Sequence, residues 1–173
     1  MVQRPLGAVR EKIFTLMLSD EIKSNPDAAA ILAASSEYLA DGKIDRGETT
    51  LVVPAEHLLA VGQILKTKQE YARLSTVTGV DWYPMEPRFE VVYHLHSLAR
   101  NARLRVKCKL AGANPEIDSL TGIWRSANWY ERETFDLFGI RFRNHPDLTR
   151  IMMPEDWEGH PLRKDYPVTG PRI

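Results

Sequence analysis

Three consecutive segments in the middle of the chain have the residue pattern of β-strands. Residues 71–83 are rich in β-branched and aromatic residues, and residues 89–98 and 103–110 alternate between two sets of side chains. A period of two is typical of a strand that buries one face. The segments are separated by short loops, whereas a parallel connection needs a dozen or more residues. The pattern therefore predicts an antiparallel meander.

Helical spacing of apolar residues occurs on both sides of this meander. It predicts helices over residues 6–18 and 55–66, with a short buried strand at 49–54 between them. Asn25-Pro26 has the form of a helix cap followed by proline in the first turn, which favours a helix within residues 25–41, although this stretch also fits a strand.

A further helix is predicted after the meander, ending at Phe138. Asn128 and Glu131 have the spacing of a capping box, and Gly139 follows the last turn. Asp118-Ser119 is predicted to open a short helical segment. Helices that flank a contiguous antiparallel meander make an α+β domain.

The C-terminal segment differs in composition. Five of the eleven prolines lie in the last 28 residues. Proline lacks an amide donor and fixes φ, so this stretch is expected to be neither helix nor central strand. We therefore expect an α+β domain over residues 1–142 and an extended tail over 143–173, which lies along a partner or back along its own domain.

Composition excludes several classes of protein and of binding site. A length of 173 residues predicts one domain, and 23 basic against 23 acidic residues argue against a dedicated nucleic-acid binder. No apolar stretch of about 18 residues occurs, and the N-terminus lacks an uninterrupted signal core, so we expect a soluble cytoplasmic domain. The single Cys108 excludes a disulfide framework, a four-cysteine zinc site and an iron–sulfur cluster held by this chain alone.

One strand carries a candidate metal site. His94 and His96 lie two residues apart, so their rings share a face, and Glu90 is on the same face. Two imidazoles can hold a metal only with a third or fourth ligand, and no clear further one is near. We expect hydrogen-bonded histidines and no metal.

The next strand carries alternating basic residues, Arg103, Arg105, Lys107 and Lys109, with Cys108 facing the core. Aromatic residues that would stack on nucleic-acid bases are absent from this face. We expect a solvated face or a contact with an acidic protein partner, and an inert Cys108 that packs as a small hydrophobe.

Three carboxylates lie in the predicted helix that ends at Phe138. Glu133 and Asp136 are three residues apart and could share a face, as an acid/base pair must. Glu131 aligns instead with the phenylalanines, which suggests a partly buried carboxylate that needs a basic partner such as an arginine. Residue chemistry alone indicates no catalytic, cofactor-binding or metal site.

Aromatic residues and arginines concentrate between residues 124 and 166. These residue types are enriched at the energetic centres of protein interfaces. A proline-rich segment is already extended, so it loses less entropy when it docks. The composition favours an interaction protein.

The sequence ERETFDLFGIRFRNHPDLTRIMMPEDWEGHPLRKDYPV, residues 131–168, resembles the signature of the thirty-kilodalton subunit of respiratory complex I, which is the C subunit of the bacterial proton-pumping NADH:quinone oxidoreductase. The resemblance covers roughly residues 48–170. Two departures are Thr149, where the family has a basic residue or proline, and Asp41–Gly47, which look like extra residues before a strand. The matching signature residues are Glu131, Arg132, Glu133, Asp136, Gly139, His145, Pro146 and Arg150.

The resemblance implies a non-catalytic structural subunit of the peripheral arm. It implies that FMN and iron–sulfur clusters belong to partner subunits and that this chain binds none. The implied partners are the quinone-site subunit, of the forty-nine-kilodalton type, and the iron–sulfur subunits of a hetero-oligomeric complex. That complex transfers electrons from NADH to quinone and translocates protons. Membrane contact is then only through the complex, on the cytoplasmic face of the bacterial inner membrane.

The tail is the predicted partner interface, and we expect an arginine–carboxylate pair to be its strongest contact. An equivalent subunit of a ferredoxin-dependent quinone-reducing complex or of a membrane-bound hydrogenase would have a similar sequence. The interface residues are Trp157, His160, Pro161, Leu162, Arg163, Lys164, Asp165, Tyr166 and Pro167.

Overall fold

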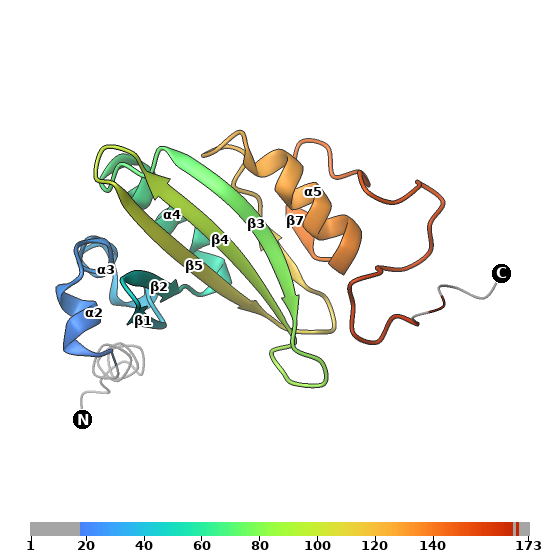
Figure 1. Cartoon of the computed structure of the whole chain (residues 1–173), viewed down its shortest axis with the longest axis horizontal. Coiled ribbons are helices and arrows are strands. Elements are labelled where there is room, and N and C mark those ends of the chain that lie inside the picture. The colour runs from blue at the N-terminus through green and yellow to red at the C-terminus, as the bar shows by residue number, and fades with distance from the viewer. Residues whose placement is uncertain (1–17, 168, 170–173) are drawn as a thin grey trace, which may run out of the picture.

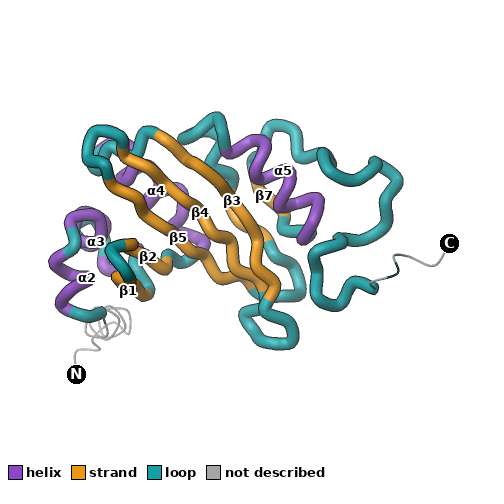
Figure 2. Tube along the Cα trace, viewed as in Figure 1, coloured by secondary structure: helices purple, strands orange, loops and turns teal. Residues whose placement is uncertain are grey.

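The computed structural model describes residues 18–167 and 169. It is an α+β structure in which helices accompany a five-stranded, mostly antiparallel sheet (Figures 1 and 2). The helix predicted over residues 6–18 lies outside the described residues except for Leu18. The elements in chain order are α2 (Asp20–Ser24), α3 (Pro26–Leu32), η1 (Ser36–Tyr38), β1 (Asp41–Asp45), β2 (Glu48–Val52), η2 (Ala55–His57), α4 (Leu58–Thr67), β3 (Arg73–Asp81), β4 (Phe89–Ser97), β5 (Ala102–Leu110), β6 (Glu116–Asp118), α5 (Ala127–Phe138) and β7 (Arg141–Arg143).

The predicted meander is confirmed as β3–β4–β5, with each pair antiparallel. The meander belongs to a larger sheet with the strand order β1-β2-β5-β4-β3, in which β2 runs parallel to β5. Residues 41–47, which look like extra residues in the sequence, form β1 and the turn of a hairpin with β2.

The N-terminal helical prediction is only partly right. Asn25 caps α3, and its side chain accepts hydrogen bonds from the N–H groups of Asp27 and Ala28. The helix ends at Leu32 and does not continue to residue 41. After it the chain makes one short turn of 3-10 helix and enters β1.

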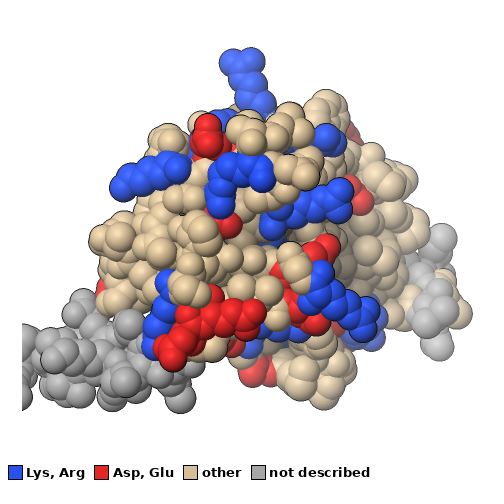
Figure 3. All heavy atoms as spheres, turned by 60° about the vertical axis from the view of Figure 1, so that its left-hand side comes forward, with Lys and Arg blue, Asp and Glu red and all other residues tan. Residues whose placement is uncertain are grey.

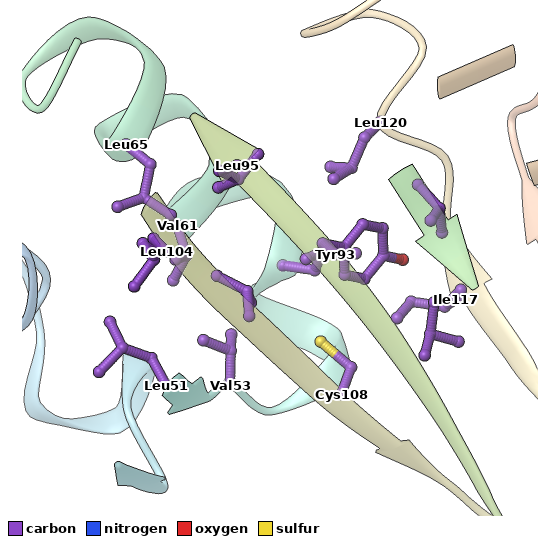
Figure 4. Close-up of a cluster of buried hydrophobic side chains, with 14 of the residues drawn as sticks. Leu51, Val53, Val61, Leu65, Tyr93, Leu95, Leu104, Cys108, Ile117 and Leu120 are labelled. Atoms are coloured by element: carbon purple, nitrogen blue, oxygen red, sulfur yellow. The ribbon is translucent and has the colours of Figure 1, made fainter. Parts of the chain in front are cut away.

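The core lies between the sheet and α4. The apolar side of α4 meets the inward side chains of β4 and β5, and Leu120 belongs to the same cluster (Figure 4). Trp124 also packs in this cluster. Burying such side chains supplies most of the favourable free energy of folding. The opposite face of β3–β5, turned to the viewer in Figure 1, carries no helix of the described chain.

Helix α5 lies along β3, the strand at the end of the sheet (Figure 1). The Ser126 hydroxyl donates to the carbonyl of Leu74 at 3.0 Å, and the Thr134 hydroxyl lies 3.4 Å from the carbonyl of Val77. Gly79 permits close packing, because a Cβ added there would lie 2.8 Å from the ring of Phe138. Helix and strand are therefore in direct contact along most of the helix.

Two local predictions around α5 are wrong. Asp118 does not open a helix; it lies opposite Arg143 in the two-stranded parallel sheet of β6 and β7, and the two side chains form two hydrogen bonds of 3.0 Å. Asn128 is not a cap, because α5 begins at Ala127 and Glu131 turns inward. The predicted end is confirmed: Gly139 has a φ of 70°.

Candidate functional site

The carboxylate of Asp136 ties α5 to the C-terminal segment, which we define as residues 144–167. Its Oδ2 accepts the N–H groups of Ile151, Met152 and Met153 at 3.0, 2.7 and 2.9 Å, and its Oδ1 accepts Nη1 of Arg150 at 2.6 Å. Burial alone would raise the pKa of Asp136, but these donors outweigh it and lower the pKa below its usual value. The segment is anchored on a buried charge.

The end of α5 is a second attachment point for the C-terminal segment. Carbonyl groups in the last turn of a helix lack helical partners. Here Leu162 N–H donates to the carbonyl of Leu137 at 3.0 Å, and Nε of Arg163 donates to that of Phe138 at 2.6 Å. A Cβ added at Gly139 would come within 2.5 Å of His160 and Arg163. Gly139 thus adopts the left-handed backbone that ends the helix, and its lack of a side chain lets the C-terminal segment approach closely.

Arg88, at the start of β4, forms a third attachment. Its guanidinium group binds Asp81 through Nε and Nη2 at 2.9 and 2.8 Å, and binds Asp165 through Nη1 and Nη2 at 2.8 and 2.6 Å. The N–H of Lys164 donates to Asp81 at 2.8 Å. The hydrogen bond from Arg88 lowers the pKa of Asp81 to about 2 despite burial. The sequence did not identify Asp81 and Arg88 as residues that bind the C-terminal segment. The local signal for their pairing is that they carry opposite charges on the two sides of a turn.

Glu131 is fully buried, where the sequence suggested partial burial, and the basic residue beside it is a histidine and not an arginine. It accepts the Ser119 hydroxyl at 2.6 Å and the Leu120 N–H at 2.7 Å, with Nε2 of His145 3.9 Å away. Burial raises its pKa to about 7, against the lowering effect of these hydrogen bonds. Glu131 therefore joins α5 to the loop after β6.

The remaining signature residues have different surroundings. Arg132 donates to both the carbonyl and the hydroxyl oxygen of Thr149, at 3.1 and 2.7 Å. Thr149, where the sequence departs from the family pattern, is therefore the hydrogen-bond partner of a signature residue. Glu133 is half-buried, and Pro146 is exposed. The spacing of Glu133 and Asp136 would allow an acid/base pair, but Asp136 is instead bound to the C-terminal segment.

The structure brings most of the predicted interface residues together. A shallow hollow of about 680 Å³ is lined by Trp157, Pro161–Lys164, Tyr166 and Pro167, together with Thr169. His160 and Asp165 turn toward the chain's own domain, where they contact α5 and Arg88. No helix or strand occurs in residues 144–167, and the predicted domain boundary at 142/143 falls within β7.

The strand face that carries His94 and His96 has an ion pair that engages Glu90. Both histidines are half-buried, and Glu90 is bound to Lys107 at 2.7 Å. Within residues 18–167 and 169, no group of three or more His, Cys, Asp or Glu side chains is arranged to hold a metal. Cys108 is buried as predicted, and burial raises the pKa of its thiol.

The basic stripe on β5 is partly neutralised by acidic neighbours. Arg105 pairs with Glu48 at 2.8 Å, and Lys107 with Glu90. Figure 3 shows acidic and basic side chains on one side of the molecule, without a surface of a single sign. Across the part of the chain that the structure describes, no helix is long and apolar enough to cross a bilayer.

Known proteins resemble this chain in sequence and fold. A model of the respiratory-chain NADH dehydrogenase 30 kDa subunit matches residues 51–172. The NADH-quinone oxidoreductase C subunit of Citrifermentans bemidjiense is 52% identical over 73% of this chain and 78% of its own length. The corresponding C subunit of Geotalea uraniireducens is 43% identical over 89% of this chain and 94% of its own.

Two solved structures share the fold. A trypsin-resistant fragment of Nqo5 has a TM-score of 0.58 and 32% identity, over 62% of this chain and 88% of the fragment. A chain of the membrane-bound sulfane sulfur reductase, an archaeal respiratory membrane complex, has a TM-score of 0.71 and 27% identity, over 81% of this chain and 83% of its own. From the signature on α5 and the C-terminal segment, together with these matches, the chain belongs to the family of the 30 kDa subunit of respiratory-chain NADH dehydrogenase.

Proposed function

We propose that the chain is a structural subunit of NADH-quinone oxidoreductase, in the peripheral arm of the complex. The observation that carries this is the match to the C subunit of Geotalea uraniireducens, which extends over nearly the full length of both chains. Electron transfer from NADH to quinone then takes place in partner subunits, which hold FMN and the iron–sulfur clusters. This chain positions those partners.

The C-terminal segment is the proposed contact with the quinone-site subunit. Asp136, Arg88 and the last turn of α5 hold this segment against the domain. Leu162, Lys164 and Pro167 nevertheless face outward. A fixed backbone with outward side chains costs little entropy on docking. The position in which this segment holds the quinone-site subunit affects electron transfer there, because small displacements of reacting groups lower a reaction rate steeply.

We propose that the complex places this chain on the cytoplasmic face of the bacterial inner membrane. The chain would reach the membrane only through its partners, including the iron–sulfur subunits. The finding that supports this is the match to subunits of respiratory-chain NADH dehydrogenase, since the proposal follows from membership of that complex.

Truncation tests the proposed role of the C-terminal segment. A chain ending at Met153 lacks every predicted interface residue, and a control chain ending at Pro167 keeps them all. We expect the first to abolish assembly of the complex and the second to assemble normally, as measured by native electrophoresis of solubilised membranes. An intact complex with the shorter chain and only slower turnover would contradict the proposal.

A second candidate is the equivalent subunit of a ferredoxin-dependent quinone-reducing complex or a membrane-bound hydrogenase. The similarity to a chain of the archaeal sulfane sulfur reductase favours it, since that respiratory complex is named for sulfane sulfur and not for NADH or quinone. Mass spectrometry of the complex purified through this chain distinguishes the two. An NADH-binding flavoprotein subunit supports the first candidate, and its absence supports the second.

A further inference from the structure

The loop between β3 and β4, residues 82–87, exposes an unusual amount of apolar surface. We call it the hairpin tip; it projects beyond the end of the sheet in Figure 1. Trp82, Tyr83 and Met85 are 44%, 53% and 57% exposed. They are three of the eight large hydrophobic side chains that the described residues expose, and they lie within four consecutive positions. Exposure of this kind, concentrated in one place, marks interaction surfaces.

The hairpin tip is held in one conformation by its own hydrogen bonds. The N–H of Tyr83 donates to Asp81 at 3.0 Å, and that of Met85 donates to the carbonyl of Trp82 at 3.0 Å. Glu86 accepts the N–H groups of Arg88 and Gly112, both at 3.1 Å. A loop ordered in advance loses little entropy when it binds.

The charges around the hairpin tip argue against a lipid surface. Glu86 is the only charged residue within the tip, and it accepts backbone hydrogen bonds. At the base, Arg88 is shared between Asp81 and Asp165, and the cations Lys164 and Arg163 also lie near it. Anionic membranes attract clusters of unpaired basic residues, whereas the three basic residues here are matched by three acidic ones. Aromatic and methionine side chains are instead enriched where proteins meet.

The position of the hairpin tip relative to the C-terminal segment is fixed. Arg88 and Asp81 at its base bind Asp165 and the N–H of Lys164. The tip therefore continues the surface that we propose as the partner contact. A projecting group of apolar side chains beside such a surface fits a recess in the partner better than a flat face.

We infer that the hairpin tip is an anchor, which inserts Trp82, Tyr83 and Met85 into an apolar pocket on a neighbouring polypeptide of the complex. The inference rests on the proposed function, because it requires that the chain work within a complex and is supported by the nearness of the tip to the proposed contact surface of the C-terminal segment.

Oxidative footprinting of the unaltered full chain tests this directly. Met85 and Met152 are exposed to a similar degree, 57% and 61%, so both should oxidise readily in the isolated chain. In the purified complex we expect Met85 to be protected from oxidation. Met152 lies in the C-terminal segment, which is itself a proposed contact, so the control is Leu98 in the β4–β5 turn. Leu98 is 68% exposed and should react in the complex as it does in the isolated chain. Equal reactivity of Met85 in chain and complex would overturn the inference.

Three further outcomes would also overturn it. Protection of Met85 in the isolated chain that rises with protein concentration would indicate a second copy. Protection of the isolated chain by vesicles of phosphatidylcholine and phosphatidylglycerol would indicate lipid. A chain that purifies without partners would defeat the proposed function as well, whereas a reactive Met85 in an otherwise intact complex would defeat the anchor alone.

Competition between chains measures the strength of the anchor. The double variant Trp82→Ala/Met85→Ala is expressed together with the unaltered chain, and the ratio of the two in the complex is measured by mass spectrometry. Truncated anchor residues typically cost about 2 kcal/mol, which corresponds to a roughly thirtyfold preference for the unaltered chain. Leu98→Ala is the matched control and should show no preference. Equal incorporation of a double variant that unfolds at the same temperature as the unaltered full chain would overturn the inference.

Discussion

The guanidinium group of Arg88 and the carboxylate of Asp165 are joined by two hydrogen bonds, of 2.8 and 2.6 Å, across 77 positions of sequence. The same guanidinium group binds Asp81, whose side chain is fully buried. One arginine therefore ties a buried carboxylate at the end of β3 to an exposed one in the C-terminal segment. Paired bonds of this geometry are among the strongest polar contacts in proteins.

Replacing Arg88 with leucine should release the C-terminal segment and destabilise the domain. The variant leaves the buried charge of Asp81 without its partner, which costs about 3–5 kcal/mol. Denaturant unfolding measures this loss, and faster hydrogen exchange at the Lys164 amide reports the release. Arg105→Leu is the control, because its pair with Glu48 is more exposed than the pair of Arg88 with Asp81 and is worth about 1 kcal/mol or less. Similar losses in the two variants would contradict the role of Arg88.

Asp136→Asn should loosen residues 151–153 without disturbing helix α5. The amide group has nearly the same size but replaces one accepting oxygen with a donor, so N–H groups of the C-terminal segment lose their acceptor. We expect a loss of about 2 kcal/mol or more and faster exchange at Met152 and Met153. Glu133→Gln, on the same helix and half-buried, should change stability by less than about 0.5 kcal/mol.

Glu131 should make the protein less stable as pH rises. Its pKa is about 7 in the folded protein against 4.5 as the reference value, so the folded state binds a proton that the unfolded state has released between these pH values. The stabilisation is complete below pH 4.5 and is lost as pH rises through 7. The loss is roughly 3 kcal/mol.

Glu131→Gln supplies the test of this pH dependence. Glutamine keeps the shape of the protonated acid and does not titrate, so the variant should have a flatter stability curve between pH 4.5 and 7 in urea unfolding. A variant that follows the unaltered protein across this range would show that another group is responsible. His145, 3.9 Å away, is not that group: burial lowers its pKa, so its titration would make the protein more stable as pH rises.

Gly139→Ala should be more damaging than Gly47→Ala. Both glycines have left-handed backbone, with φ of 70° and 80°, so both variants carry a strain of about 1–2 kcal/mol. A Cβ at position 139 would also collide with His160 and Arg163, whereas one at position 47 would meet nothing within 4 Å. We expect a further loss of about 1–3 kcal/mol at position 139, measured as the difference in unfolding free energy. Equal losses would show that packing of the C-terminal segment adds nothing.

The sequence predicts those structural features that depend on residues close to one another along the chain. The meander follows from alternation along β3–β5, and the end of α5 follows from Gly139, because strand periodicity and helix caps are local. The parallel pairing of β2 with β5 joins Thr49 to Leu104, and no local pattern encodes it. Asn128 and Glu131 show the limit of spacing rules: their interval fits a capping box, yet burial directs Glu131 to Ser119.

The same limit applies to the site. Prolines and aromatic residues mark the C-terminal segment in the sequence, but its path is set by Asp136 and Asp81, which lie 15 and 83 residues from the atoms they bind. A sequence pattern does not show which carboxylate accepts which distant N–H group. At the hairpin tip the pattern assigns Trp82 and Tyr83 to the end of a strand, although β3 ends at Asp81, and it does not show their exposure, which is a property of the folded surface.

The parallel pairing of β2 with β5 has a consequence for the order of folding. During synthesis the β1–β2 hairpin leaves the ribosome more than fifty residues before the strand that it must join. Contacts between such distant segments form slowly, because the loop that connects them must first be closed. The β3–β4–β5 meander has only short loops. We therefore expect β1 and β2, which are synthesised first, to join the sheet last, when β2 pairs with β5 of the folded meander.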